Sequence, residues 1–438
     1  MSTEKHTIRI VDKTHYDRQY FVTPSTDNLG PLDDSSVRIQ STILGLSSNN
    51  LAYCASGKVL HWWDTFPVPE FVEAPYNDRS QYGISPGWGY ATILESTIPT
   101  LKNGSLLWGF FPISTFPVDL FLQQSPKIQG HFIEISEHRA KVMPLYQRYI
   151  SVSDTLESVK SETSPGVREL AWKSALLPPW KSAYTFNRFA FASLPGDPVL
   201  HPGIGHPWSP EDADLKRTLV ICLGAGTKTC RSFVHQLTTK RAPGSGPVAV
   251  LEVSSAAPEL SPFASFQSEV QIKSIKYADL HSGTSSDWLF AQSIDRFVIV
   301  DFAGRAGVCE PLSNQLRANK AGIKVEVLIV GGESKVYTPE DLAERQAIIT
   351  RLGAVRCNAS AIREDAQAAI GEARFFSDQD AAFDELLQEQ LANGSDAVLG
   401  VKLGIHKGLR GAEGIEGGWD RVCTGNLKGD EGLAFLLW

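Results

Sequence analysis

Hydrophobic and polar positions divide the chain into three regions with different patterns. From about residue 7 to residue 160, short apolar or alternating runs are separated by frequent turns, and Pro, Gly, Trp and Phe are dense. Runs of this length and period are typical of β-strands, and turns at this density favour a distorted β-barrel. The predicted strands cover residues 7–11, 36–46, 89–95, 105–111, 120–122 and 131–135.

The second region, from about residue 187 to 330, alternates short β-branched runs with helical segments. Strands that alternate with helices imply right-handed crossovers and a parallel sheet covered on both faces. The predicted strands are residues 219–223, 248–253, 270–275, 297–301 and 325–330, and the helices include 227–237, 287–293 and 303–318.

The third region begins near residue 373 and contains a helix over 378–391, a strand-like run over 396–403 and a glycine-rich tail. A chain of 438 residues has room for two domains. We therefore predict an α/β protein with a β-barrel domain over 1–186 and a doubly wound parallel sheet over 187–372. The segment 373–438 is expected to return to the first domain.

The composition excludes several classes of protein. Hydrophobic residues make up 42% and charged residues 21%, as in an ordinary globular protein. A net charge of −8 without an offsetting Lys/Arg cluster argues against a nucleic-acid partner. The N-terminus lacks an apolar signal segment and the apolar run 106–122 is broken by prolines, so we expect no membrane association and a cytoplasmic protein. Six scattered cysteines without a C-x-x-C pair indicate reduced thiols.

The segment 217–229 carries the strongest chemical signal. A buried strand up to Leu223 is broken by Gly224 and Gly226, and a helical segment follows. A strand that turns tightly into a helix directs free backbone N–H groups and a positive dipole end at a bound phosphate, as in a Rossmann-type dinucleotide site. The full fingerprint has a third glycine where this chain has Thr229. The candidate cofactor residues of this turn are Gly224, Gly226, Thr227, Lys228 and Thr229.

The strands that follow the turn add further cofactor candidates. Glu252 near the end of the second strand is placed to accept hydrogen bonds from a ribose 2′-hydroxyl, which favours NAD, or it is a solvated strand end. Ser254 and Ser255 instead favour a 2′-phosphate, and with Lys228 nearby we expect NADP(H), with NAD as the alternative. Small residues after two later strands let a backbone approach a ligand closely. These residues are Ala303, Gly304, Gly331 and Gly332.

Three segments and the glycine turn that follows them, four matches in order, resemble the medium-chain dehydrogenase/reductase superfamily, in its zinc-independent quinone- and enoyl-reductase branch. Residues 36–50 are similar to the opening strand of its GroES-like catalytic domain and the Asn-bearing loop that follows, and 102–109 to one of its turns. Residues 177–184 resemble its Leu-Pro…Thr-Ala-Tyr segment, with Ser182 in place of the threonine that faces the nicotinamide. The resemblance implies a GroES-like barrel, a Rossmann-type sheet and a cofactor role for Ser182.

A narrower resemblance is to a group of microbial proteins known only as a domain of unknown function. It rests on sequence segments spread over most of the first 190 residues. Its coenzyme half usually carries Ser-Ser-Lys-Thr where this chain has Gly226-Thr-Lys-Thr229. The matching segments are 48–53, 63–67, 84–90, 108–115, 138–140 and 144–149.

Several alternative chemistries lack their residues. The cysteine and Gly-His-Glu ligands of zinc-dependent alcohol dehydrogenases are missing, so we expect no metal. His201 and His206 fall in a Pro-rich loop without carboxylates or cysteines at ligand spacing, and a surface loop is the preferred interpretation. The turn lacks the glycine before lysine that a P-loop needs, and no complete Gly-x-Ser-x-Gly elbow occurs.

Metal-free hydride transfer remains, and it requires a proton donor. Tyr53, four residues after Asn49, is the first candidate, and Tyr146 and Tyr149 follow. The commoner role of each is a buried tyrosine bonded to backbone. Of the nearby aromatics, Trp62, Trp63, Trp88, Trp108 and Phe110, we expect most to be barrel core rather than pocket.

The predicted function is therefore an NAD(P)H-dependent, metal-independent reductase of an activated alkene or ketone. Its substrate would be a small apolar carbonyl compound, enone, quinone or polyketide-like ketone, in secondary metabolism. A homodimer is expected from the resemblance. The alternative is a non-redox protein on the same fold, a lyase, isomerase or binding protein, that has lost dinucleotide binding.

Overall fold

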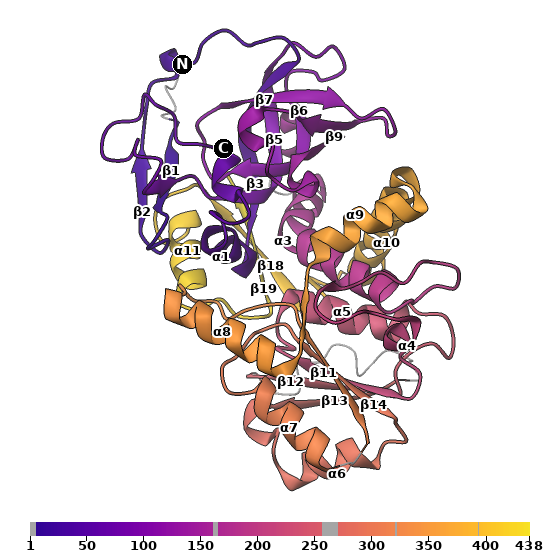
Figure 1. Ribbon diagram of the computed structural model, residues 1–438. Helices are drawn as coiled ribbons and strands as arrows, with labels where there is room; N and C mark the ends of the chain where they lie inside the picture. Colours follow the sequence, from indigo (N-terminus) through magenta and orange to yellow (C-terminus); the bar gives the residue numbers. More distant parts are fainter. Residues whose placement is uncertain (1–5, 161–164, 256–269, 320–321, 393) are drawn as a thin grey trace.

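The computed structural model describes residues 6–160, 165–255, 270–319, 322–392 and 394–438 (Figure 1). A β-barrel lies at one end of the molecule and a parallel sheet at the other, with helix α3 (Pro165–Thr185) between them. Both labelled chain ends lie on the barrel side. Within the described residues, no helix combines the length and apolar character that a membrane crossing requires.

The barrel is a closed ring of antiparallel strands. In order around the ring these are β3, β5, β6, β9, β8 and β7, and β7 pairs back onto β3 to close it. β18 and β17 lie beyond β19, which pairs with the second half of β3. The bounds are β3 Ser36–Leu46, β5 Pro86–Ser96, β6 Ser105–Pro112, β7 Val118–Gln124, β8 His131–Glu134, β9 Arg148–Thr155, β17 Ala397–Val398, β18 Val401–Lys407 and β19 Glu431–Leu436.

Shorter elements surround the barrel. A small antiparallel sheet has the order β2-β1-β4. Helix α1 is capped by the Ser47 side chain, which accepts the backbone N–H of Asn49, while the Asn50 side chain accepts that of Ser47. The bounds are β1 Ile8–Asp12, β2 Gln19–Val22, β4 Tyr82–Gly83, α1 Ser48–Ala55, α2 Leu156–Val159 and α11 Ile415–Cys423.

The second sheet has the strand order β10-β16-β15-β14-β11-β12-β13, and every pair except β10 with β16 is parallel. Strand addition reverses at β11, which is the switch point at which ligands bind in doubly wound sheets. The strand bounds are β10 Gly203–Ile204, β11 Thr218–Leu223, β12 Ala249–Ser254, β13 Gln271–Lys276, β14 Arg296–Asp301, β15 Lys324–Ile329 and β16 Val355–Cys357.

Helices cover both faces of this sheet. α5 packs on the face toward α3, and α6 and α7 lie on the opposite face (Figure 1). α9 and α10 follow β16 and pack against α3 and each other. The helix bounds are α4 Pro210–Ala213, α5 Lys228–Thr239, α6 Gly283–Ala291, α7 Cys309–Asn319, α8 Pro339–Leu352, α9 Ala359–Ile370 and α10 Glu372–Leu391.

One hydrophobic core joins the two sheets through α3. Its members include Ile43 of the barrel, Trp172 and Trp180 of α3, Phe233 of α5 and Val250 of the parallel sheet. Both tryptophans are fully buried. The burial of a helix on both sides removes a large apolar area from water, at about 25 cal/mol per Å². The two domains are therefore fused rather than hinged on a thin contact.

The predicted fold class is confirmed, with differences in single elements. The Asn-bearing segment is helix α1 instead of a loop. The helix expected over 303–318 begins only at Cys309, because Gly304 and Gly307 have φ of 60° and 71°. The pattern did not reveal α3, which contains Pro178 and Pro179 in its interior. The glycine-rich tail contains α11 and β19.

We expect Gly45→Ala to destabilise the protein. A Cβ at position 45 would lie 1.9 Å from the Ser174 carbonyl oxygen of α3, and neither backbone has room to move. Overpacking of this kind lowers the free energy of unfolding by about 1–3 kcal/mol. Urea unfolding followed by tryptophan fluorescence measures the loss. Gly30→Ala, where nothing lies within 4 Å, is the matched control and should unfold as the wild type does.

Candidate functional site

The turn after β11 leaves backbone donors open. Gly224 has φ of 82°, and its N–H and that of Ala225 both donate to the Val253 carbonyl at 2.9 Å. The Thr227 side chain caps α5 by accepting the Cys230 N–H at 3.3 Å. Within the described residues, the N–H groups of Gly226, Lys228 and Thr229 have no acceptor. Three donors at a helix N-terminus form a cradle for an anion.

The opposite side of the turn is covered by the loop before β19. A Cβ on Gly429 would lie 2.3 Å from the Gly226 carbonyl oxygen, so the two backbones touch. The Lys228 side chain is only 8% exposed. Burial lowers its pKa to about 8, against the opposing effects of Glu431 and Asp430. The lysine charge therefore lies between the turn and this loop.

The candidate ribose-binding residues at the end of β12 differ in burial and in their hydrogen-bond partners. Glu252 is buried, and its carboxylate accepts a hydrogen bond of 2.6 Å from the Ser274 hydroxyl. Ser255, at the strand end, is exposed, and its hydroxyl accepts from Nη1 of Arg305 at 3.0 Å. The Arg305 guanidinium lies 4.7 Å from the ring centre of Tyr277, which follows β13. Ser254 is half-buried beside them.

Arg305 and Tyr277 were not among the sequence candidates. Both stand directly after segments that the pattern did single out, Arg305 after Gly304 and Tyr277 after the third strand of the sheet. An exposed guanidinium over an aromatic ring, next to a serine at the end of β12, is suited to a phosphate on the ribose.

The small residues after β14 and β15 pack against one another. The Asp301 carboxylate accepts the N–H groups of Ala303 and Gly304 at 3.0 and 2.8 Å. A Cβ on Gly331 would lie 2.0 Å from the Phe302 carbonyl oxygen, and one on Gly332 would meet Arg345. These glycines therefore allow close contact between neighbouring strand ends, and the amides of Ala303 and Gly304 are already used.

Four of the predicted site residues line a single cavity of about 190 Å³. Its walls come from the barrel, from α3 and from α9, which follows the C-terminal end of β16. Because the strands are parallel, this is the same sheet edge that carries the glycine turn. The four predicted residues are Asn49, Tyr53, Tyr146 and Ser182, and Trp88 and Trp108 also line the cavity.

Three side chains, Tyr53, Tyr146 and Ser182, bring hydroxyl groups to the cavity. Trp88 Nε1 donates to the Tyr53 hydroxyl at 2.9 Å. Burial raises the pKa of Tyr53 well above its ordinary value. Burial also raises the pKa of Tyr146, to about 12, although hydrogen bonds from Ser360 and Tyr53 oppose the shift. Both phenols are therefore protonated at neutral pH. The Ser182 hydroxyl donates to the Pro178 carbonyl at 3.4 Å.

Tyr149 does not line this cavity. Its ring is fully buried in the barrel core, and its hydroxyl donates to the Phe110 carbonyl at 2.8 Å and accepts from Arg139 Nη1 at 3.0 Å. Both hydrogen-bonding capacities of the phenol are used, so we do not carry a proton-donor role for Tyr149 further. Trp62, Trp63 and Phe110 are likewise buried in the packed clusters of the barrel.

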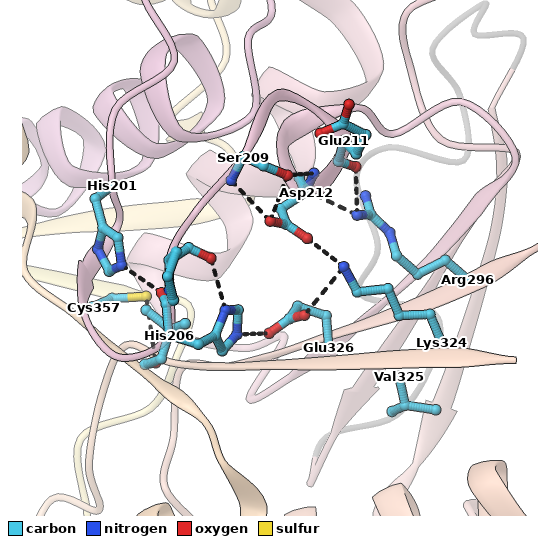
Figure 2. Close-up of polar contacts among 12 residues, drawn as sticks. His201, His206, Ser209, Glu211, Asp212, Arg296, Lys324, Val325, Glu326 and Cys357 are labelled. Carbon is cyan, nitrogen blue, oxygen red and sulfur yellow. Dashed lines mark hydrogen bonds and ion pairs between the residues drawn. The ribbon is translucent and has the colours of Figure 1, made fainter.

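The two histidines weighed as metal ligands make hydrogen bonds within the protein (Figure 2). His201 Nε2 donates to the His206 carbonyl at 2.8 Å, and His206 Nε2 lies 2.6 Å from Glu326 Oε1. Lys324 pairs with Asp212 in the same group. No three His, Cys, Asp or Glu side chains in the described ranges converge as a metal site, and the absence of a metal stays a prediction.

Comparison with known proteins places the chain in a family. A profile described as "Protein of unknown function (DUF2855)" matches residues 44–428, most of the chain. The chain belongs to the DUF2855 family. This confirms the narrower of the two resemblances seen in the sequence. A search of curated proteins found no match.

This DUF2855 protein shares its fold with a solved structure. CurA from Vibrio vulnificus, solved in complex with NADPH, is 11% identical with a TM-score of 0.50, and 99% of each chain is covered. A putative NADPH:quinone reductase from Bacillus thuringiensis is 11% identical with a TM-score of 0.49, and again 99% of each chain is covered. The predicted GroES-like and Rossmann-type architecture is confirmed by the first of these likenesses and by the strand order.

We expect Asp301 to make stability fall as pH rises from about 4 to 6. Burial raises its pKa to about 6 from an ordinary 3.8, so the fold favours the protonated carboxyl. That contribution is complete below pH 4 and is lost as pH rises through 6. Asp301→Asn stays neutral and still accepts the two amides. Its stability relative to the wild type should therefore grow by about 2–3 kcal/mol between pH 4 and 7.5, as measured by urea unfolding. A difference that stays constant with pH would contradict this.

Proposed function

We propose that this protein is an NADP(H)-dependent reductase of an activated alkene or ketone. The observation that carries the proposal is the set of open amides of Gly226, Lys228 and Thr229 at the switch point of the parallel sheet. In a sheet with this strand order, the pyrophosphate of a dinucleotide binds at such a turn. CurA, which shares the fold, was crystallised with NADPH.

The group at the end of β12 supports NADP(H) over NAD. A 2′-phosphate beside Ser255 would receive charge-assisted hydrogen bonds from Arg305, whose exposed guanidinium already donates to the Ser255 hydroxyl. Glu252, which a ribose 2′-hydroxyl would need, is instead occupied by Ser274. We therefore assign Ser255 and Arg305, with Ser254 nearby, to the 2′-phosphate.

The cavity supplies the groups that reduction needs besides the cofactor. Bound NADPH provides a hydride from its nicotinamide. Ser182 on α3 is proposed to face the nicotinamide, and Asn49 on α1 to position the substrate in the cavity. Tyr146 is proposed as the proton donor to a developing enolate or alkoxide, because its phenol lines the cavity and burial keeps it protonated at neutral pH. The rings of Tyr53 and Trp88 pack against that of Tyr146, and Trp88 also donates a hydrogen bond to Tyr53.

Other features of the proposal rest on the sequence and remain to be tested. They are metal independence, a role in secondary metabolism, a cytoplasmic location, a homodimer, and domain boundaries at 186 and 372. β19 pairs with β3, so the last segment does contribute to the barrel sheet.

One contact favours a second function, a non-redox protein on the same fold. The loop at Gly429 touches the Gly226 carbonyl and buries Lys228, which narrows access to one side of the turn. Two further segments that could narrow this sheet edge, Phe302 and the loop from 194 to 214, have other contacts. Phe302 is buried against Phe233, and the loop from 194 to 214 bonds to β15 and β16.

Titration of NADPH and NADH, followed by cofactor fluorescence, tests the function. We expect NADPH to bind more tightly than NADH. Arg305→Gln should weaken NADPH binding by about 10- to 100-fold, because a charge-assisted hydrogen bond contributes roughly 1.5–3 kcal/mol, and should leave NADH binding within about twofold.

Arg351→Gln is the matched control, since Arg351 is an exposed arginine of the same domain whose ion pairs are with Glu310 and Glu344. It should bind both cofactors as the wild type does. If neither dinucleotide binds at millimolar concentration, the reductase is excluded and the non-redox function remains. If Arg305→Gln weakens both cofactors equally, the 2′-phosphate assignment is wrong.

A further inference from the structure

The charged side chains that line the cavity at α3 and α9 are all positive. Three cationic side chains line it, Arg148, Lys181 and Arg363, and no Asp or Glu is among its lining residues. The remaining walls are mostly aromatic or apolar. A positive charge that is removed from water is costly unless an anion neutralises it. The excess of positive charge among the lining residues therefore indicates an anionic ligand.

Arg363 is the decisive residue. It is only 5% exposed, and its Nε is completely buried without a hydrogen-bond acceptor. Within the described parts of the chain, no carboxylate forms an ion pair with its guanidinium; Asp380 acts on it only at longer range, and the guanidinium carbon lies 5.6 Å from the centre of the Phe375 ring. A buried guanidinium carries five N–H donors in a fixed fork that matches a carboxylate or a phosphate.

The other two cations differ in how far their charge is neutralised. Lys181 is 7% exposed, and its ammonium lies 3.6 Å from Asp380, too far for a strong hydrogen bond. Burial lowers the pKa of Lys181 to about 8. Arg148 is paired with Glu372 at 2.9 Å and stacks on Phe376. Arg363 and Lys181 are therefore available to form an ion pair with a ligand. Arg148 is already paired, and it mainly adds to the positive potential of the cavity.

The size and the aromatic walls restrict the rest of the ligand. Trp88 and Trp108 stack at 6.0 Å with an interplanar angle of 20°, and Phe376 stands on another side. A cavity of about 150 Å³ accommodates one benzene molecule, so about 190 Å³ accommodates a single ring or a short conjugated chain with one small polar group.

We propose that this cavity binds a small planar, unsaturated molecule by an anionic group, a carboxylate or a phosphate, held by Arg363 and Lys181. The proposal rests on the proposed function in one respect, because it names the substrate of that reductase as an anion rather than a purely apolar enone. The binding itself does not require the cofactor.

Calorimetric titration of the full-length protein, with and without NADPH, tests the proposal with three probes. trans-Cinnamate carries the carboxylate, cinnamamide has the same shape without charge, and phenyl phosphate carries the alternative anion. We expect at least one of the two anions to bind tenfold or more tightly than cinnamamide. The tighter of the two identifies whether a carboxylate or a phosphate is preferred.

Arg363→Met should reduce that preference to within about twofold, and Arg363→Lys, which keeps the charge, should restore part of it. Arg363→Met should melt no lower than the wild type, because it removes a buried, unpaired charge. Should it fail to fold, Lys181→Met measures the same loss. The matched control is Arg351→Met, which should keep the full preference.

The proposal is overturned if the wild type binds no anion more tightly than cinnamamide, or if folded Arg363→Met keeps the wild-type preference. Failure of the reductase is a separate result. A protein that prefers the anion but binds neither NADPH nor NADH keeps this site and loses the redox function. A protein that binds NADPH without any preference for the anion loses only this site.

Discussion

The burial of α3 on two sides is the constraint on which the rest of the structure depends. Its tryptophans join the barrel core to the core beneath α5, and Gly45 lets the backbone of β3 approach that of the helix. Because α3 is held from both directions, the last turns of the helix have little freedom. Those turns present Lys181 and Ser182 to the cavity. The domains thus share one rigid element where most two-domain enzymes have a mobile cleft.

Much of the fold was predictable because its strands are strongly apolar and its turns carry glycine. β3 has the predicted bounds, and the five predicted strands of the parallel sheet lie within two residues of β11, β12, β13, β14 and β15, whereas the short parallel strand β16 was not predicted. Helix α3 was not predicted, since adjacent prolines argue locally against a helix and only packing on both sides outweighs that cost. Tyr146 and Tyr149 are only three residues apart, but local structure places just one of them at the cavity. A 3-10 turn ends at Gln147 and β9 begins at Arg148, so the two rings face different environments.

The site was predictable only in part, because one sequence pattern serves two purposes. Glycine after a strand leaves amides open at Gly226, but at Gly331 it allows one strand end to touch the next. The pattern does not distinguish a ligand from a neighbouring backbone. Arg363 was not found, since it belongs to α9 and comes to line the same cavity as Tyr53 only after the chain has passed through the whole parallel sheet. What marks Arg363 as a candidate binding residue is that no carboxylate in the described part of the chain pairs with its guanidinium. That can be seen only in the folded structure.

The pairing of β19 with β3 has a consequence for biosynthesis. Phe435 lies opposite Leu44, so two strands in register are separated by almost the entire chain. Contacts of such long range form late and slow the folding of a domain. On the ribosome the parallel sheet is complete while half of β3 still lacks its neighbour. An apolar strand edge is thus exposed during synthesis, which makes nascent chains of this protein candidates for chaperone binding until β19 emerges.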